Sequence, residues 1–201
     1  MALSDGLDVG KSEAFSKRVG VTRMPWRLVA EWLGFQAVWL ACAVGAARGL
    51  NWPGVAAAAI FLIATLSARG WAKPEVKAVL ASGVFGAVAE TLLTTTGLVL
   101  HGAAPSLTVA GPGFDLPPAW IIALWLAFGA TIPAMEAVLG RTIMLNAALV
   151  GAVTGPLAYL AGVRLGALQF PAGAWPALAA LALLWALALP LLLHGYRKAA
   201  R

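Results

Sequence analysis

Six apolar stretches, each close to the length needed to cross a lipid bilayer, constrain this 201-residue chain more than any other feature. A bilayer core of about 30 Å requires about 20 apolar residues in an α-helix. Hydrophobic residues make up 61% of the chain and charged residues only 11%, whereas a soluble domain carries about 25% charged residues. A soluble fold of this length could not bury so much apolar surface. The sequence therefore predicts an all-α integral membrane protein, a bundle of six transmembrane helices.

The predicted spans form one transmembrane domain over residues 26–196. A polar tail, 1–25, precedes this domain and a short basic tail, 197–201, follows it. Tryptophans stand at several of the predicted span ends, as expected for indole rings at the headgroup level: Trp26, Trp52, Trp120 and Trp175. The spans are predicted at 26–47, 52–68, 76–100, 118–139, 143–163 and 175–193.

Lysine and arginine are unevenly distributed over the segments between these spans. With six spans, twelve of the fourteen Lys and Arg residues lie on one side, and only Arg48 and Arg164 lie on the other. Basic segments remain in the cytoplasm, so both termini are predicted to be cytoplasmic, in a bacterial inner membrane. The basic residues form no dense patch on a soluble face, which argues against nucleic acid as a partner. The predicted partner is the lipid bilayer.

Glu90 is the most informative single residue, because an ionisable side chain inside a span is costly and usually faces the bundle interior. Small residues beside it would let a neighbouring helix approach closely, so Glu90 is predicted to face another helix or a cavity. A buried carboxyl can act as a proton donor, which makes Glu90 the candidate catalytic residue; the alternative is a carboxyl that only fixes packing. The face shared with Glu90 carries Gly83, Gly86, Thr94, Gly97 and His101, and another face carries Leu80, Val84, Val88 and Leu92.

Other polar residues near the same membrane face complete the candidate site. Thr94, His101, Asp115, Tyr159 and Arg164 are predicted to contact a substrate. Arg164 is the expected ion partner of Asp115, or of Glu90 if the fifth span packs on the third. The loop that contains Asp115, 101–117, is either a plain connector, which is the default, or a cap over a cavity.

Two further glutamates lie near the opposite face. Glu136 is a candidate substrate contact on a kinked, glycine-containing face, with a tight helix crossing as the alternative. Glu31 follows Arg27 by four residues, which favours an ion pair within one helix. The fifth span is predicted to be the central helix because a stripe of small residues runs along it: Gly151, Gly155, Ala158, Gly162 and Gly166.

The sequence lacks the common motifs of metal, cofactor and nucleophile sites. No Cys, His and Asp cluster has the spacing of metal ligands, so no metal site is predicted. The sequence contains no phosphate-binding glycine loop, no nucleophile elbow and no histidine pair suited to haem, and it identifies no cofactor. The single cysteine, Cys42, lies inside an apolar run and is predicted to be a small buried side chain.

Three stretches, 34–39, 118–128 and 151–170, carry a resemblance to a known family. They resemble an uncharacterised family of small multi-pass bacterial inner-membrane proteins, a domain of unknown function, and the likeness extends from about Arg27 to the C-terminus. The resemblance implies an Asn near Glu31, an Asp near Glu90 and a polar pair near 134–136, and this chain departs at all three. Family members often occur beside fatty-acid-modifying genes, which implies work linked to lipids.

Three functions are compatible with these features. The first is an intramembrane enzyme or accessory protein that acts on or binds an apolar, lipid-like substrate, a fatty acyl chain or an isoprenoid, in an intramembrane cavity. Acid–base chemistry at a buried carboxyl would then be its mechanism. The second is a non-catalytic subunit that binds other membrane subunits in a larger complex. The third is a small transporter or proton pathway using Glu31, Glu90 and Glu136.

Overall fold

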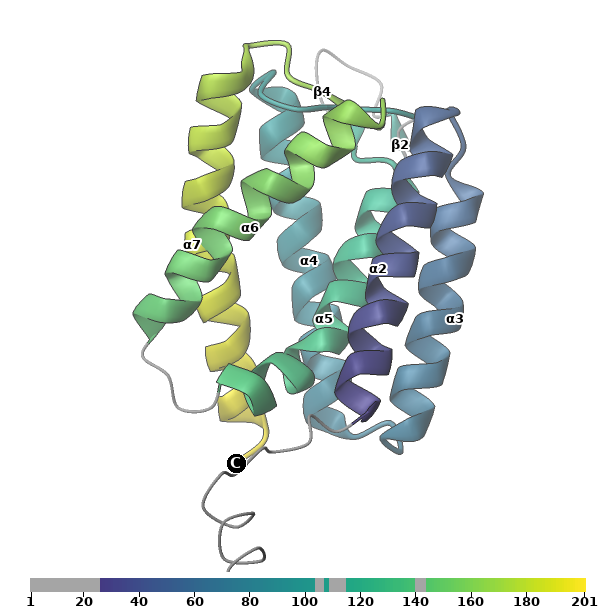
Figure 1. Cartoon of the computed structure of the whole chain (residues 1–201), viewed down its shortest axis with the longest axis vertical. Helices are drawn as coiled ribbons and strands as arrows, with labels where there is room; N and C mark the ends of the chain where they lie inside the picture. Colours follow the sequence, from purple (N-terminus) through teal and green to yellow (C-terminus); the bar gives the residue numbers. More distant parts are fainter. Residues whose placement is uncertain (1–25, 104–106, 109–114, 140–143) are drawn as a thin grey trace, which may run out of the picture.

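A computed structural model describes residues 26–103, 107–108, 115–139 and 144–201 of the chain. The predicted tail 1–25 and Arg141 lie outside the described residues, and so does the side chain of Asp115. In the part described, the chain forms a bundle of α-helices closed at one end by short strands (Figure 1).

Six helices make up the described bundle. Five of them have 21 to 26 residues and are apolar enough to cross a membrane. The sixth, with 17 residues, is at the lower limit of a spanning helix. The prediction of an all-α, six-helix membrane bundle is thus confirmed. The helices are α2 (Trp26–Ala47), α3 (Trp52–Ala68), α4 (Lys73–Thr95), α5 (Ala119–Leu139), α6 (Met144–Arg164) and α7 (Ala174–Ala199).

Helix ends follow local chemistry as well as hydrophobicity. Helix α4 begins at Lys73, three residues before the predicted span, with a proline in its first turn, where a missing N–H does no harm. It ends at Thr95 instead of residue 100, because Gly97 adopts a φ of +70° and turns the chain away from the helix. Helix α7 continues to Ala199, beyond the predicted span end, and carries basic residues in its last turn.

Short strands close the end of the bundle at which α4 terminates; we call it the strand end. Strand β1 (Leu100–His101) pairs antiparallel with β4 (Leu168–Gln169), and β2 (Leu107–Thr108) pairs antiparallel with β3 (Asp115–Leu116). The N–H of Gly102 also donates to the carbonyl of Ala167 at 2.8 Å. The start of loop 101–117 is therefore hydrogen-bonded to the segment after α6, while β2 and β3 pair within the loop itself.

Helix α5 is the centre of the bundle, packing against α2, α3, α4 and α7, whereas α6 packs mainly against α7. The prediction that the fifth span is central is therefore wrong. Its glycine stripe meets α7 along part of its length only: Gly151 and Gly155 lie against Trp185 of α7, whereas Gly162 lies against Leu168 of β4. A small-residue stripe reports close approach to a helix, but it does not report how many helices surround it.

The face of α4 that carries Glu90 packs closely on α5, as predicted. Gly83 and Gly86 lie against Leu126 and Trp125, and the hydroxyl of Ser82 donates to the carbonyl of Trp125 at 2.6 Å. The opposite, lipid-facing side of α4 is 57% to 68% exposed at Leu80, Val84, Val88 and Leu92. Glu90 itself is fully buried, so the prediction that it faces protein is confirmed.

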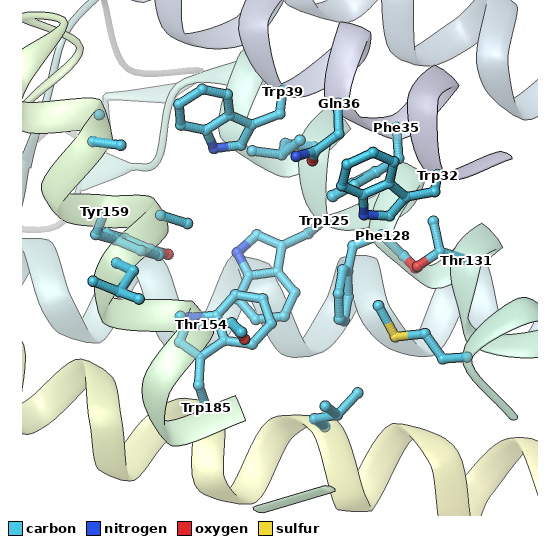
Figure 2. A pocket seen from close by; sticks show the side chains of 18 of the residues that line it. Trp32, Phe35, Gln36, Trp39, Trp125, Phe128, Thr131, Thr154, Tyr159 and Trp185 are labelled. Carbon is cyan, nitrogen blue, oxygen red and sulfur yellow. The ribbon is translucent and has the colours of Figure 1, made fainter. Parts of the chain in front are cut away.

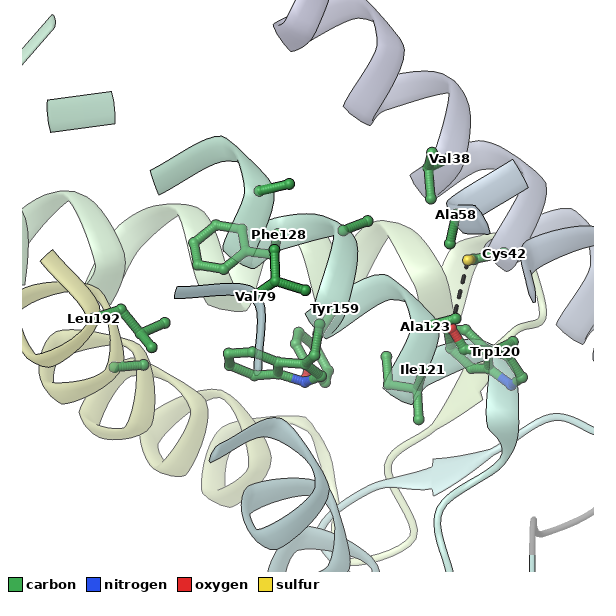
Figure 3. Close-up of a cluster of buried hydrophobic side chains, with 14 of the residues drawn as sticks. Val38, Cys42, Ala58, Val79, Trp120, Ile121, Ala123, Phe128, Tyr159 and Leu192 are labelled. Atoms are coloured by element: carbon green, nitrogen blue, oxygen red, sulfur yellow. Dashed lines mark hydrogen bonds between the residues drawn. The ribbon is translucent and has the colours of Figure 1, made fainter. Parts of the chain in front are cut away.

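A second part of the core joins α2, α3 and α5 near the strand end (Figure 3). Cys42 is fully buried there, which confirms its predicted character. Its Sγ lies 3.5 Å from the carbonyl of Trp120, to which the thiol donates. This contact links α2 to the start of α5.

Candidate functional site

Glu90 is hydrogen-bonded to side chains from three different elements. The indole N–H of Trp125 on α5 donates to its Oε1 at 2.8 Å, and the hydroxyl of Tyr159 on α6 donates to the same oxygen. Nε2 of His101 in β1 is hydrogen-bonded to Oε2 at 2.9 Å. The side chains of Glu90 and His101 are 0% and 2% exposed. The arrangement satisfies both carboxyl oxygens deep inside the protein.

His101 is held in turn by its surroundings. Its Nδ1 is hydrogen-bonded to the hydroxyl of Thr94 at 3.2 Å, one helical turn beyond Glu90. The Trp120 ring meets the imidazole edge-on at a centroid distance of 5.9 Å, and its N–H donates to the carbonyl of Gly102 at 2.9 Å. Because Gly97 turns the chain after α4, His101 folds back over the helix that carries Glu90 and Thr94.

Four of the residues predicted from the sequence therefore form one cluster: Glu90, Thr94, His101 and Tyr159. The alternative pairing of Arg164 with Glu90 depended on the fifth span packing on the third, whereas α6 packs mainly on α7, and Glu90 is instead bound by His101, Trp125 and Tyr159. Arg164 is exposed at the end of α6. The predicted role of Asp115 rests on a side chain outside the described residues.

Glu136 and Glu31 lie at the opposite end of the bundle, which we call the basic end. Glu136 pairs with Arg197 at 2.7 Å and does not join the Glu90 cluster. Glu31 pairs with Arg69, the residue after α3, at 2.5 Å, so the predicted pairing with Arg27 is wrong. Arg69 also donates to the carbonyl of Ala130 at 3.2 Å, because the turn between α3 and α4 brings it beneath α5.

A cavity of about 710 Å³ lies between α2, α5 and α6, with part of α7 as its floor (Figure 2). On α2 its lining extends from Leu28 to Ala43, a distance of about 22 Å at 1.5 Å per residue. The cavity therefore follows most of the apolar thickness of the bundle. Its volume is in the range of small-molecule sites, about 300–1,000 Å³.

Eight aromatic side chains form part of the wall of this cavity. Trp125 and Trp185 are stacked with centroids 4.7 Å apart and an angle of 12° between the rings, and Phe128 meets both rings edge-on. The aromatic residues of the wall are Trp32, Phe35, Trp39, Trp120, Trp125, Phe128, Tyr159 and Trp185. Composition gave a hint of this wall, since nine tryptophans are many for 201 residues, but only the fold brings rings from four helices together.

Tyr159 and Trp125 connect the cavity to the Glu90 cluster. Both line the cavity and both donate to Glu90, whereas Glu90 and His101 are absent from the described lining. Any proton exchange between Glu90 and a molecule in the cavity would therefore pass through Tyr159, since the indole of Trp125 only donates. Among the described residues, no group of three or more His, Cys, Asp or Glu side chains is arranged to hold a metal ion.

Comparison with known proteins places this architecture in a family. No curated protein and no solved structure is detectably similar to the chain. A family of proteins of unknown function, DUF2878, matches residues 28–191, which include the described helices from α2 to most of α7. The match also covers every residue named above as lining the cavity or contacting Glu90. The chain therefore belongs to the DUF2878 family of proteins of unknown function.

Proposed function

We propose that this protein binds an apolar, lipid-like molecule, a fatty acyl chain or an isoprenoid, in the cavity between α2, α5 and α6. The observation that carries the proposal is the cavity itself, about 710 Å³ in volume and aligned with the apolar thickness of the bundle. Lining side chains are overwhelmingly apolar, as in most small-molecule sites. A soluble substrate would find few hydrogen-bond partners there.

The Glu90 cluster gives the cavity a possible reaction centre. Tyr159 presents a hydroxyl at the wall, and Glu90 behind it, with His101 and Thr94, can accept and return a proton. We therefore propose Tyr159 as the contact residue and Glu90 as the group that acts through it. Glu31 and Glu136 are held in ion pairs at the basic end, far from this relay, which favours the lipid-site proposal over a proton pathway through all three glutamates.

A bulky side chain introduced into the cavity tests the proposal. Ala158 on α6 lines the cavity, so Ala158→Phe is expected to fill part of it and to reduce ligand binding at least tenfold. The probe is a sixteen-carbon fatty acid with a diazirine group on its chain, and a farnesyl analogue with the same group. Photolabelled peptides from the purified full-length protein are identified by mass spectrometry.

A control variant separates the cavity from the lipid-facing surface. Ala59 on α3 is exposed on the outside of the bundle, so Ala59→Phe is expected to leave labelling unchanged. In the unaltered protein, labels should concentrate on α2, α5 and α6 residues of the cavity. Labelling spread over the outer faces of α3 and α4, and insensitive to Ala158→Phe, would contradict the proposal.

We also propose that the basic end faces the cytoplasm of a bacterial inner membrane. The observation in favour is that Arg69, Arg197 and Lys198 lie at this end, while the strand end carries only Arg48 and Arg164 among the described cations. Positively charged segments remain cytoplasmic. A green fluorescent protein fused after Arg201 is expected to be fluorescent, and an alkaline phosphatase fused there to be inactive; the opposite pair of results would reverse the orientation.

A further inference from the structure

Gln36 has an unusual position for an amide. It is the eleventh of the 22 residues of α2, so it lies near the middle of the membrane, and it lines the cavity. Figure 2 shows its amide pointing inward from α2, on the same side of the helix as Trp32 and Trp39. Among the described residues, Gln36 forms no hydrogen bond.

An amide without a partner in an apolar environment is unfavourable, since it gives up its hydrogen bonds to water. Gln36 is exposed, and its neighbours on the helix, Leu33 and Leu40, are 55% and 50% exposed. It therefore lies at the edge of the cavity lining, with its amide turned toward the cavity (Figure 2). The position calls for a ligand atom that can accept or donate a hydrogen bond halfway along the cavity.

The charge of the lining restricts what that ligand atom can belong to. The lining contains no Lys, Arg or His in the part of the chain described, and Glu31 and Tyr159 are its ionisable residues. Arg69 is directed to Glu31 and also faces Glu75 at 3.7 Å, so its charge is already paired outside the cavity. An ionised carboxylate or phosphate seated among the described lining residues would meet no cationic side chain there, which is unfavourable.

The aromatic wall adds a shape preference. Trp32 and Trp39 stand on either side of Gln36 along α2, and Trp125 lines the same cavity from α5. Aromatic rings pack well against flat π-systems in offset or edge-to-face arrangements. A saturated chain would use these surfaces only through its hydrophobic area and would bring no polar atom to Gln36.

We propose that the natural ligand is a neutral lipid whose head is a flat, conjugated ring with carbonyl or hydroxyl oxygens, one of them bound by the Gln36 amide, and whose hydrocarbon tail fills the rest of the cavity. This inference rests on the proposed function, and it narrows the ligand from any acyl or isoprenoid chain to a tailed quinone- or phenol-like compound.

Paired probes test the role of Gln36. The first is a benzoquinone with a ten-carbon tail, whose binding to the purified full-length protein is followed by quenching of tryptophan fluorescence. The second is decylbenzene, which keeps the ring and tail but lacks oxygen, measured by its competition with the quinone. Gln36→Leu is expected to raise the dissociation constant of the quinone about tenfold, the effect of one lost hydrogen bond. The dissociation constant of decylbenzene, obtained from its competition with the quinone, is expected to stay the same.

Further variants make the result decisive. Gln36→Met keeps the length of the side chain without hydrogen bonding and should behave like Gln36→Leu, whereas Leu33→Ala on the lipid-facing side should bind both probes normally. Equal quinone affinity in the unaltered protein and both Gln36 variants would overturn the inference. So would a dimer, seen by native mass spectrometry, that Gln36→Leu converts to a monomer, since Gln36 would then contact a second copy.

The outcomes also distinguish this inference from the proposed function. If the diazirine fatty acid labels the cavity but the quinone does not bind saturably, the inference fails and the lipid site stands. If neither probe uses the cavity, both fail.

Discussion

Replacing Glu90 with leucine is expected to destabilise the protein by about 3–5 kcal/mol, among the largest effects of any single substitution. The change removes the acceptor shared by Trp125, Tyr159 and His101, and each donor left buried without a partner adds a desolvation penalty. The measurement is the free energy of unfolding in mixed micelles titrated with sodium dodecyl sulfate.

Glu90→Gln separates loss of hydrogen bonding from loss of charge. The amide oxygen can still accept from Trp125 and Tyr159, and the amide N–H can donate to Nε2 of His101 if the imidazole proton moves to the nitrogen facing Thr94. We expect a loss of only about 1 kcal/mol for this variant. If Glu90→Gln and Glu90→Leu were equally destabilised, the charge and not the hydrogen-bond pattern would hold the cluster together.

Glu136→Leu is the control for removing a carboxylate as such. Its ion pair with Arg197 is partly exposed, with the two side chains 26% and 22% accessible. Partly exposed pairs contribute about 0–1 kcal/mol, so this variant should be close to the unaltered protein. If Glu136→Leu lowered the free energy of unfolding as much as Glu90→Leu, the assay would not distinguish a buried carboxylate from a partly exposed one.

Gly86→Ala is expected to destabilise the protein by about 1–3 kcal/mol, the range for overpacking. A Cβ at this position would overlap the ring of Trp125. That indole cannot move without breaking its hydrogen bond to Glu90 and disturbing its stacking on Trp185. In an unhindered helix the same substitution would be stabilising by up to about 1 kcal/mol. The clash with Trp125 therefore determines that the free energy of unfolding falls instead of rising.

Gly195→Ala on α7 is the matched control, because a Cβ there meets no atom within 4 Å. It is expected to be neutral or slightly stabilising. Unfolding followed by tryptophan fluorescence reports both variants, and Gly86→Ala should also shift the emission spectrum, since it displaces Trp125 from its stack. An unaffected Gly86→Ala protein would mean that α4 can move away from α5 without loss.

Much of the Glu90 cluster could be predicted from residue spacing. Glu90 and Thr94 are four residues apart, which puts both on one face of a helix, and the glycines of that face required a close neighbour. His101 joined them in the prediction because helical spacing was extended through residue 101. It does reach Glu90, but from β1, after the turn at Gly97.

The partners from other helices were harder to predict. Trp125 donates to Glu90 from 35 residues away, and Arg69 pairs with Glu31 from 38 residues away. A single sequence does not say which helices are neighbours, and the glycine stripe on α6 suggested a central position that α5 holds instead. The cavity likewise depends on where α6 crosses the bundle, and the residues of α6 do not specify that position.

The sequence by itself determined that the protein lies in a lipid bilayer and that its spans are helices. Apolar runs of bilayer length must be helical, because lipid offers no hydrogen-bond partner to an open backbone. It also determined that Glu90 would be turned away from lipid, since a carboxyl exposed to lipid would have no hydrogen-bond partner. Only the tertiary structure decided which donors meet Glu90 and that a cavity lies beside it. The order of the six helices is set by how their surfaces, which are nearly equally hydrophobic, pack together. Such packing depends on the shapes of side chains that are far apart in the chain.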